Sequence, residues 1–137
     1  MAIESGPQVT PFLMFSGQAE EAMNFYTSVF EGSSILRIKR YSAGEAGAEG
    51  SVCQAAFSIN GREFLCIDSP MKHAFSFTPS ISLFVTSADE AAIERYFQAL
   101  SAGGQVLMPL GEYPFSKKFG WVQDRFGVSW QLSATAI

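Results

Sequence analysis

Cysteine, histidine and long apolar runs are scarce in this sequence. It has two cysteines and one histidine in 137 residues. Cys53 and Cys66 are too few for a disulfide scaffold and too far apart for a CxxC redox motif. The first residues lack the basic and apolar regions of a secretory signal, and no apolar run approaches the roughly 20 residues of a membrane helix. We therefore expect a cytoplasmic protein that does not contact membranes.

Basic residues are also few and scattered. Nine Lys and Arg stand against 13 Asp and Glu, which gives a net charge of −4. Nucleic-acid and anionic-membrane surfaces are bound by clustered Lys and Arg, so neither is an expected partner.

Apolar residues are abundant: 47% of the residues are hydrophobic, and 13 are Phe. A chain of this length has enough of them to bury a core, and we expect residues 1–137 to form a single domain.

The apolar pattern describes one unit in the first half of the chain and repeats it in the second. The first half reads as a strand at 9–15 and a helix at 18–30, followed by strands at 34–41, 51–59 and 62–68. The second reads as a strand at 80–85 and a helix from about 88 to 102, followed by strands at 105–110, 119–124 and 128–133. A capping box of Ser87 and Glu90 is expected to start the second helix. The repeat predicts an α+β fold of two tandem βαβββ modules, 9–68 and 79–134.

Several stretches resemble a known family. They are PFLMFSGQAEEAMNFYTSVF, FSINGREFLCIDS, FSFTPSISLFV and GGQVLMPLGEYPFSKKFGWVQDRFGVSWQL. They are similar to the PhnB-like branch of the glyoxalase / bleomycin-resistance / vicinal-oxygen-chelate (VOC) superfamily. The resemblance runs from about Pro11 to Leu132 and is most specific over 120–132. It implies that the two modules form a cupped mixed sheet, the glyoxalase/bleomycin resistance/dihydroxybiphenyl dioxygenase fold, and that the protein is a homodimer.

Members of this branch are often labelled 3-demethylubiquinone methyltransferase. A methyltransferase of the common type places a Gly-rich loop after a strand of a doubly wound parallel sheet. This sequence has no G-x-G motif between a strand and a helix, and its βαβββ repeat does not suit such a sheet. We therefore do not expect methyl transfer.

Enzymes of the superfamily bind a divalent metal with inward-facing His, Gln or Glu residues. The resemblance carries these positions to Thr10 and Leu65 in the first module and to Ser80 and Gln131 in the second. Divalent metal sites need several imidazole, thiolate or carboxylate ligands, which these residues do not supply. Glu63 shares a face with Leu65 but cannot hold a metal alone. We expect no metal and no cofactor.

The lining of the cup can be predicted from strand alternation. Residues of one parity face the concave side, and those of the other parity pack under the helices. The concave set is Thr10, Phe12, Met14, Glu63, Leu65, Ile67, Ser80, Ser82, Phe84 and Gln131, with Trp121 and Phe119 as added aromatic walls. A mostly apolar lining with a few hydroxyls and an amide is typical of a small-molecule pocket. The same residues would also suit a cup filled by its own side chains.

The leading hypothesis is a metal-free protein that binds, and so sequesters, a small apolar or aromatic molecule. No catalytic residues can be named, because no nucleophile motif such as G-x-S-x-G is present. One alternative is a divergent glyoxalase-type lyase or isomerase, or a dioxygenase, with a non-standard metal site drawn from Glu63, Gln131 and His73. Another is a structural dimer with a vestigial pocket.

Overall fold

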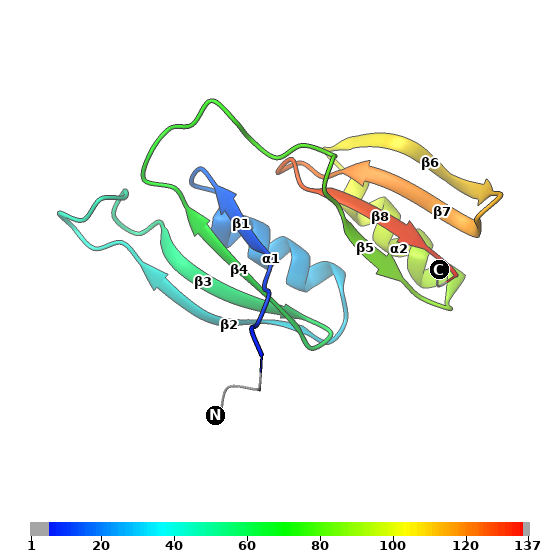
Figure 1. Ribbon diagram of the computed structural model, residues 1–137, viewed down its shortest axis with the longest axis horizontal. Helices are drawn as coiled ribbons and strands as arrows, with labels where there is room; N and C mark the ends of the chain where they lie inside the picture. Colours follow the sequence, from blue (N-terminus) through cyan, green and yellow to red (C-terminus); the bar gives the residue numbers. More distant parts are fainter. Residues whose placement is uncertain (1–5, 136–137) are drawn as a thin grey trace. The chain divides into compact units, whose positions relative to one another are not determined.

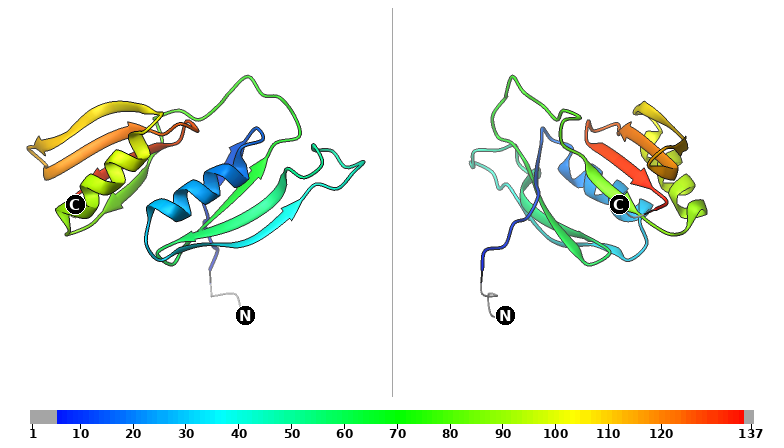
Figure 2. Two further views of the ribbon diagram at one scale, coloured as in Figure 1. Left: turned by 180° about the vertical axis from the view of Figure 1, so that it is seen from behind. Right: turned by 45° about the vertical axis from the view of Figure 1, so that its right-hand side comes forward.

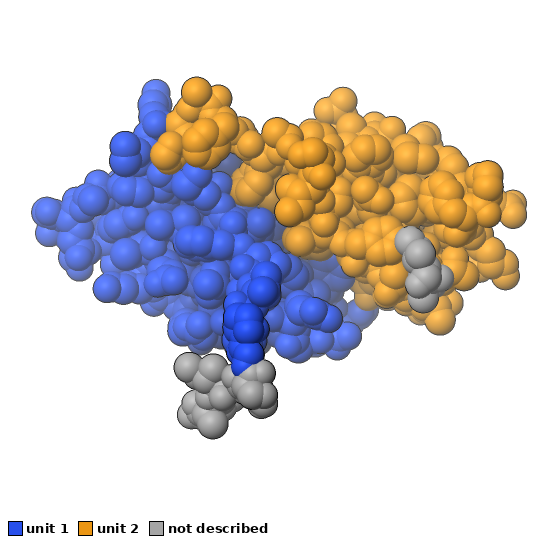
Figure 3. All heavy atoms as spheres, in the orientation of Figure 1, with its two compact units in different colours: residues 1–72 blue, residues 73–137 orange. Residues whose placement is uncertain are grey.

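The computed structural model describes residues 6–135, in two compact units that divide between Lys72 and His73 (Figure 3). Each unit contains one βαβββ module (Figure 1). The elements of unit 1 are β1 (Phe12–Phe15), α1 (Ala19–Val29), β2 (Ser33–Arg40), β3 (Val52–Ile59) and β4 (Arg62–Asp68). Those of unit 2 are β5 (Leu83–Thr86), α2 (Glu90–Ser101), β6 (Gln105–Tyr113), β7 (Ser116–Gln123) and β8 (Ser129–Ser133). The predicted α+β fold of two tandem βαβββ modules is confirmed.

The sheet of unit 1 has the strand order β1-β4-β3-β2, with β1 parallel to β4 and the other neighbours antiparallel. Helix α1 lies across one face of this sheet (Figure 2). Tyr26 of the helix packs on Phe57 of β3, with ring centroids 6.0 Å apart, and Phe57 stacks on Phe64 of β4 at 5.2 Å. These three aromatic side chains are buried, so they fix which face of the sheet is covered by the helix.

Unit 2 repeats this arrangement with the strand order β5-β8-β7-β6 and with α2 on one face. Trp130 and Leu132 of β8 are buried in its core together with Ile93 and Leu100 of the helix. Gly120 of β7 faces α2, because a Cβ atom at this position would lie 2.5 Å from the ring of Phe97. The missing side chain lets the helix approach the sheet closely.

A buried aspartate stands near the end of each module and anchors several backbone groups. The Asp68 carboxylate accepts hydrogen bonds from the backbone N–H groups of Gly17, Ala19 and Val52 at 2.8, 2.9 and 2.9 Å. It thereby satisfies the first turn of α1, where Gln18 provides no side-chain cap. Asp124 accepts hydrogen bonds from two backbone N–H groups of its own turn and from Nε1 of Trp130. Both carboxylates therefore stabilise the fold.

The boundaries of some elements differ from the sequence prediction. Strand β1 begins at Phe12 and β5 begins at Leu83, so both are shorter at their N-terminal ends than expected. The predicted capping box at α2 is wrong. Asp89 is the N-cap, and its carboxylate accepts from the N–H groups of Ala91 and Ala92. Within residues 6–135, no helix is long and apolar enough to cross a membrane.

Candidate functional site

The sheet face opposite α1 contains most of the site residues predicted in the first module. Residues paired across neighbouring strands share a face. Phe12 pairs with Leu65, and Met14 pairs with Ile67. Both pairs alternate with the residues of β1 and β4 that pack under the helix, and Glu63 lies on the same face as Leu65. We call this surface the open face of unit 1. Thr10 precedes β1, so no strand pairing places it on this face.

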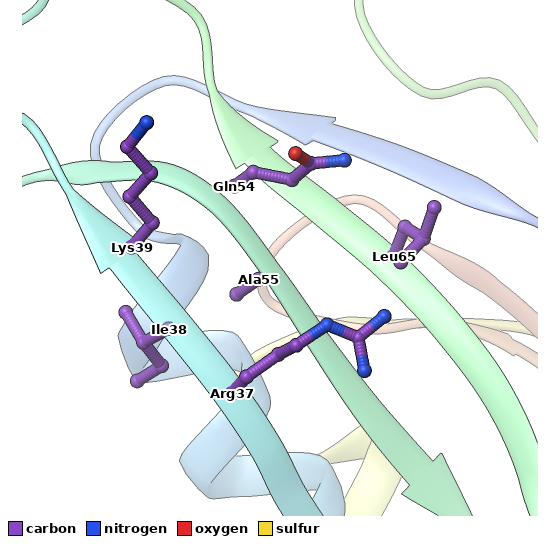
Figure 4. A pocket seen from close by; sticks show the side chains of 6 residues that line it. All are labelled: Arg37, Ile38, Lys39, Gln54, Ala55 and Leu65. Atoms are coloured by element: carbon purple, nitrogen blue, oxygen red, sulfur yellow. The ribbon is translucent and has the colours of Figure 1, made fainter. Parts of the chain in front are cut away.

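A pocket of about 240 Å³ lies over β2, β3 and β4 (Figure 4). The residues that line it are Arg37, Ile38, Lys39, Gln54, Ala55 and Leu65. Lys39 pairs with Gln54, so these two side chains extend from the same face of the sheet. Arg37 pairs with Ala56, which in turn pairs with Leu65. The side chains of Arg37, Lys39, Gln54 and Leu65 therefore belong to the open face.

The pocket carries positive charge. Nη2 of Arg37 lies 3.0 Å from Oε2 of Glu63 in an exposed ion pair. Lys39 makes no ion pair with any residue from 6 to 135. The pocket region therefore has two cationic side chains, Arg37 and Lys39, and one carboxylate, that of Glu63.

Sequence reasoning missed Arg37, Lys39 and Gln54 because the family's ligand positions drew attention to the first and last strands of each module. The strand pattern could not have located Arg37 and Lys39 either. A break in the pairing register between Ile35 and Arg37 interrupts the alternation of β2. Ile35 pairs with Phe57 on the helix side, although strict alternation places it on the same face as Arg37.

The open face of unit 2, opposite α2, contains a chain of hydrogen bonds that joins three predicted site residues through Ser129. Phe84 and Trp121 both pair with Gln131, so the three share this face. Nε2 of Gln131 donates to Oγ of Ser82 at 3.3 Å, and this hydroxyl lies 2.7 Å from Oγ of Ser129. Nε1 of Trp121 donates to the same Ser129 hydroxyl at 2.8 Å. Ser82 thus forms one polar chain with three side chains of β7 and β8.

Ser80 is not part of this chain. It lies in a turn before β5 and is hydrogen-bonded to the hydroxyl of Thr78 at 2.8 Å. It is also exposed. The structure therefore brings together Ser82, Phe84, Trp121 and Gln131 in unit 2 and leaves Ser80 outside the group.

An aromatic cluster lies beside the polar chain and is centred on Phe119. The ring centroids of Phe84, Tyr113 and Phe115 lie 6.5, 5.7 and 4.9 Å from that of Phe119. Phe119 is 4% exposed under these neighbours, whereas Phe84 is 43% and Phe115 57% exposed. The protein's own side chains therefore fill the centre of the cluster, and two phenyl rings remain open at its surface.

The groups with shifted pKa values lie away from these two surfaces. Burial raises the pKa of the Cys66 thiol to about 12, with a smaller contribution from the Asp68 carboxylate. Burial also raises the pKa of Tyr41, followed by the charges of Cys53, Asp68 and Glu45. The fully buried thiol of Cys66 is therefore protonated at neutral pH and is not a nucleophile.

The residues at the superfamily's metal positions do not fit a metal ion. Leu65 has no donor atom, and the Gln131 amide is hydrogen-bonded to Ser82. Of the alternative ligands, Glu63 is paired with Arg37, and His73 stacks on Phe75 with ring centroids 4.7 Å apart. No three His, Cys, Asp or Glu side chains within residues 6–135 are grouped so that they could hold a metal.

Two βαβββ modules, each with its first strand parallel to its last, define a protein of the glyoxalase/VOC class. The chain belongs to the family described as 3-demethylubiquinone-9 3-methyltransferase, whose model matches residues 7–133. The PhnB protein from Bacillus cereus is 56% identical, with a TM-score of 0.90 over 93% of this chain and 98% of its own.

The chain is also similar to more distant proteins. A Pseudomonas aeruginosa structure is 26% identical, with a TM-score of 0.82 over 93% of this chain and 97% of its own. The fosfomycin resistance protein FosX from Listeria monocytogenes shares the fold, with a TM-score of 0.69 at 13% identity over 99% of this chain and 96% of its own. An uncharacterized protein of Mycobacterium bovis is 29% identical over 96% of this chain and 86% of its own length.

Proposed function

We propose that this protein binds, and so sequesters, a small apolar or aromatic molecule without the help of a metal. The observation that carries the proposal is the aromatic cluster of unit 2, where Phe84 and Phe115 are partly exposed beside the polar chain of Ser82 and Gln131. Ligand pockets typically combine apolar and aromatic walls with a few polar groups that fix the orientation of the ligand. This surface has both parts.

The open rings can supply useful binding energy. Full burial of a Phe side chain stabilises a complex by roughly 1.5–3 kcal/mol, so covering a half-exposed ring contributes about 1 kcal/mol. An aromatic ligand stacked on Phe84 or Phe115 would gain roughly 0.5–1.5 kcal/mol more from the ring contact. The amide of Gln131 and the hydroxyl of Ser82 would select ligands that carry a hydrogen-bonding group beside the ring.

We do not propose methyl transfer for this protein, although the name of the family refers to it. Each sheet here mixes parallel and antiparallel neighbours, and no Gly-rich loop leads from a strand into a helix. The features by which common methyltransferases hold their cofactor are therefore missing from residues 6–135.

A thermal-shift screen with neutral and acidic aromatic compounds, run beside divalent metals, tests the proposal. A ligand at 100 times its Kd stabilises the native state by about 2.7 kcal/mol, a shift of several degrees at this size. Phe84→Ala and Phe115→Ala should each reduce the shift given by an aromatic compound. Val106→Ala is the matched control, because Val106 is similarly exposed but pairs with Val122 on the helix side of the same sheet.

An aromatic compound whose shift survives both Phe substitutions would contradict the proposal. So would a clear shift with a metal, supported by elemental analysis of the purified protein. The divergent lyase, isomerase or dioxygenase would then become the leading explanation.

A further inference from the structure

We propose that the pocket over β2, β3 and β4 is a binding site for an anionic group, a carboxylate or a phosphate, of a small molecule. The site is formed by Arg37, Lys39, Gln54 and Leu65 of unit 1. None of these residues belongs to the aromatic cluster, whose residues lie in unit 2.

The size of the pocket favours a small group. Pockets that enclose a drug-sized ligand measure about 300–1,000 Å³, and this one measures about 240 Å³. It therefore suits one charged group with a few attached carbon atoms. Leu65 provides an apolar surface on which those carbon atoms can rest.

The donor groups extend from one face of two neighbouring strands, and Figure 4 shows the Arg37 guanidinium and the Lys39 ammonium pointing in different directions. Arg37 and Lys39 stand two residues apart on β2, which places their Cα atoms roughly 7 Å apart on one face. Gln54 is directly opposite Lys39 on β3. A guanidinium, an ammonium and an amide NH₂ group thus lie on one face, and rotation of the long Arg37 and Lys39 side chains is required to bring all three donors to one anion. The planar guanidinium matches carboxylate and phosphate oxygens in particular.

Glu63 competes with an incoming anion for the guanidinium of Arg37. Its carboxylate accepts from Nη2 of Arg37 and leaves the other guanidinium N–H groups open to a second acceptor. An incoming anion must either share Arg37 with Glu63 or displace it. The local excess of positive charge lies on a protein whose net charge is −4, so overall composition does not account for it.

A structural role for Lys39 is the competing explanation. Strand β2 is at the edge of its sheet, and edge strands often carry Lys to block pairing with other chains. That role needs neither the opposite Gln54 nor the pocket, and it predicts no saturable binding of anions. The two explanations therefore give different results in a titration.

The test is an NMR titration of the ¹⁵N-labelled full chain with inorganic phosphate and, separately, with acetate, at constant ionic strength set by sodium chloride. We expect saturable shifts of the backbone amides of Arg37, Lys39 and Gln54 with at least one of the two anions. Saturation with phosphate alone assigns the site to phosphate groups, and saturation with acetate alone assigns it to carboxylates. The absence of saturable shifts at these residues with both anions would overturn the proposal.

Three variants make the test specific. Lys39→Gln should weaken binding by roughly three- to tenfold, the loss expected for one hydrogen bond of typical strength. Glu63→Gln should tighten binding several-fold, because the competing carboxylate is removed. Lys117→Gln is the matched control, an exposed lysine on a strand of unit 2. Equal losses for Lys39→Gln and Lys117→Gln would show a general charge effect and refute the site.

The outcomes for the two surfaces can be separated. Saturable anion binding in unit 1, with no aromatic compound affected by Phe84→Ala, would leave this site intact and remove the proposed function. The reverse result would remove this site alone. The NMR spectrum of each variant also shows whether it is folded, so a loss of binding cannot be confused with a loss of structure.

Discussion

The side chain of Asp68, at the end of β4, connects two other elements of unit 1. Its two carboxylate oxygens accept three backbone N–H groups, from the start of α1 and the start of β3, and it is 3% exposed. In the sequence, Asp68 is only the last residue of the strand predicted at 62–68. The contacts are between residues 16 to 51 positions apart, so no local pattern could have predicted them.

We predict that Asp68→Asn lowers the free energy of unfolding by about 2 kcal/mol. Asparagine keeps one acceptor oxygen and turns an NH₂ group toward a buried N–H, which is then left without a partner. Denaturant unfolding measures the loss. Asp89→Asn is the matched control, because asparagine is as good an N-cap as aspartate at the exposed start of α2. Equal losses for the two variants would contradict this role.

The two cysteines should differ in reactivity. Burial raises the pKa of Cys66 to about 12, and the thiolate is the reactive form, so its thiol is both inaccessible and protonated at pH 8. Cys53 is partly exposed. We predict that iodoacetamide modifies Cys53 before Cys66 in the native protein, which mass spectrometry of timed samples can follow. Modification of Cys66 at the rate of Cys53 would show that β4 opens readily.

The raised pKa of Cys66 also predicts how the free energy of unfolding changes with pH in the alkaline range. An unfolded thiol ionises near its ordinary pKa of 9.0 and the native Cys66 thiol near 12, so the native state binds more protons between these values. The free energy of unfolding should therefore be unaffected by this group below pH 9 and should fall as the pH rises from 9 to 12. Tyr41, whose pKa is also raised, contributes in the same direction. Cys66→Ala should make the fall less steep, and an unchanged slope would refute the assignment.

At the scale of single elements, the start of α2 offers a direct test of which side chain caps it. Ser87 and Asp89 are both suitable N-cap residues, and the sequence pattern favoured Ser87 because of Glu90. In the structure, the Ser87 hydroxyl accepts only from the N–H of Asp89, and Asp89 accepts from the helix itself. The backbone conformation at Asp89 is extended, as an N-cap requires.

We predict that Asp89→Ala lowers the free energy of unfolding by about 1 kcal/mol, the usual value of an N-cap. Ser87→Ala should cost less, and Glu90→Ala should have almost no effect through capping. Thermal and denaturant unfolding of the three variants rank the contributions. A larger loss for Glu90→Ala than for Asp89→Ala would restore the capping box.

Strand alternation predicted the face of a side chain correctly where the strand pairs regularly, and it failed where the pairing register shifts. The faces of Phe12, Leu65, Phe84 and Gln131 follow the predicted parity because β1, β4, β5 and β8 pair without register shifts. Strand β2 has shifts beside Arg37 and Arg40, so Arg37 and Lys39 could not be placed by parity. A bulge depends on the partner strand, which a single run of sequence does not contain.

For the whole molecule, the distribution of charge and apolar surface matters more than the totals. The net charge is −4, yet the open face of unit 1 presents Arg37 and Lys39, which would attract anions over roughly one Debye length, about 8 Å in physiological salt. Strand alternation predicted a mostly apolar lining for the cup that the family resemblance implied. The exposed phenyl rings of unit 2 agree with this expectation, whereas the pocket of unit 1 is lined by charged and polar side chains as well.

We predict that the protein is a homodimer. Large apolar side chains are exposed in both units, among them Phe12, Met71, Phe75 and Ile81, and a second copy of the chain would cover such residues. Light scattering at micromolar concentration should give twice the chain mass of 14.9 kDa. Because association stabilises only the folded state, the Tm should also fall over a roughly hundredfold dilution. A monomeric mass together with a Tm that is independent of concentration would contradict the dimer, and binding would then have to be explained by the surfaces of a single chain.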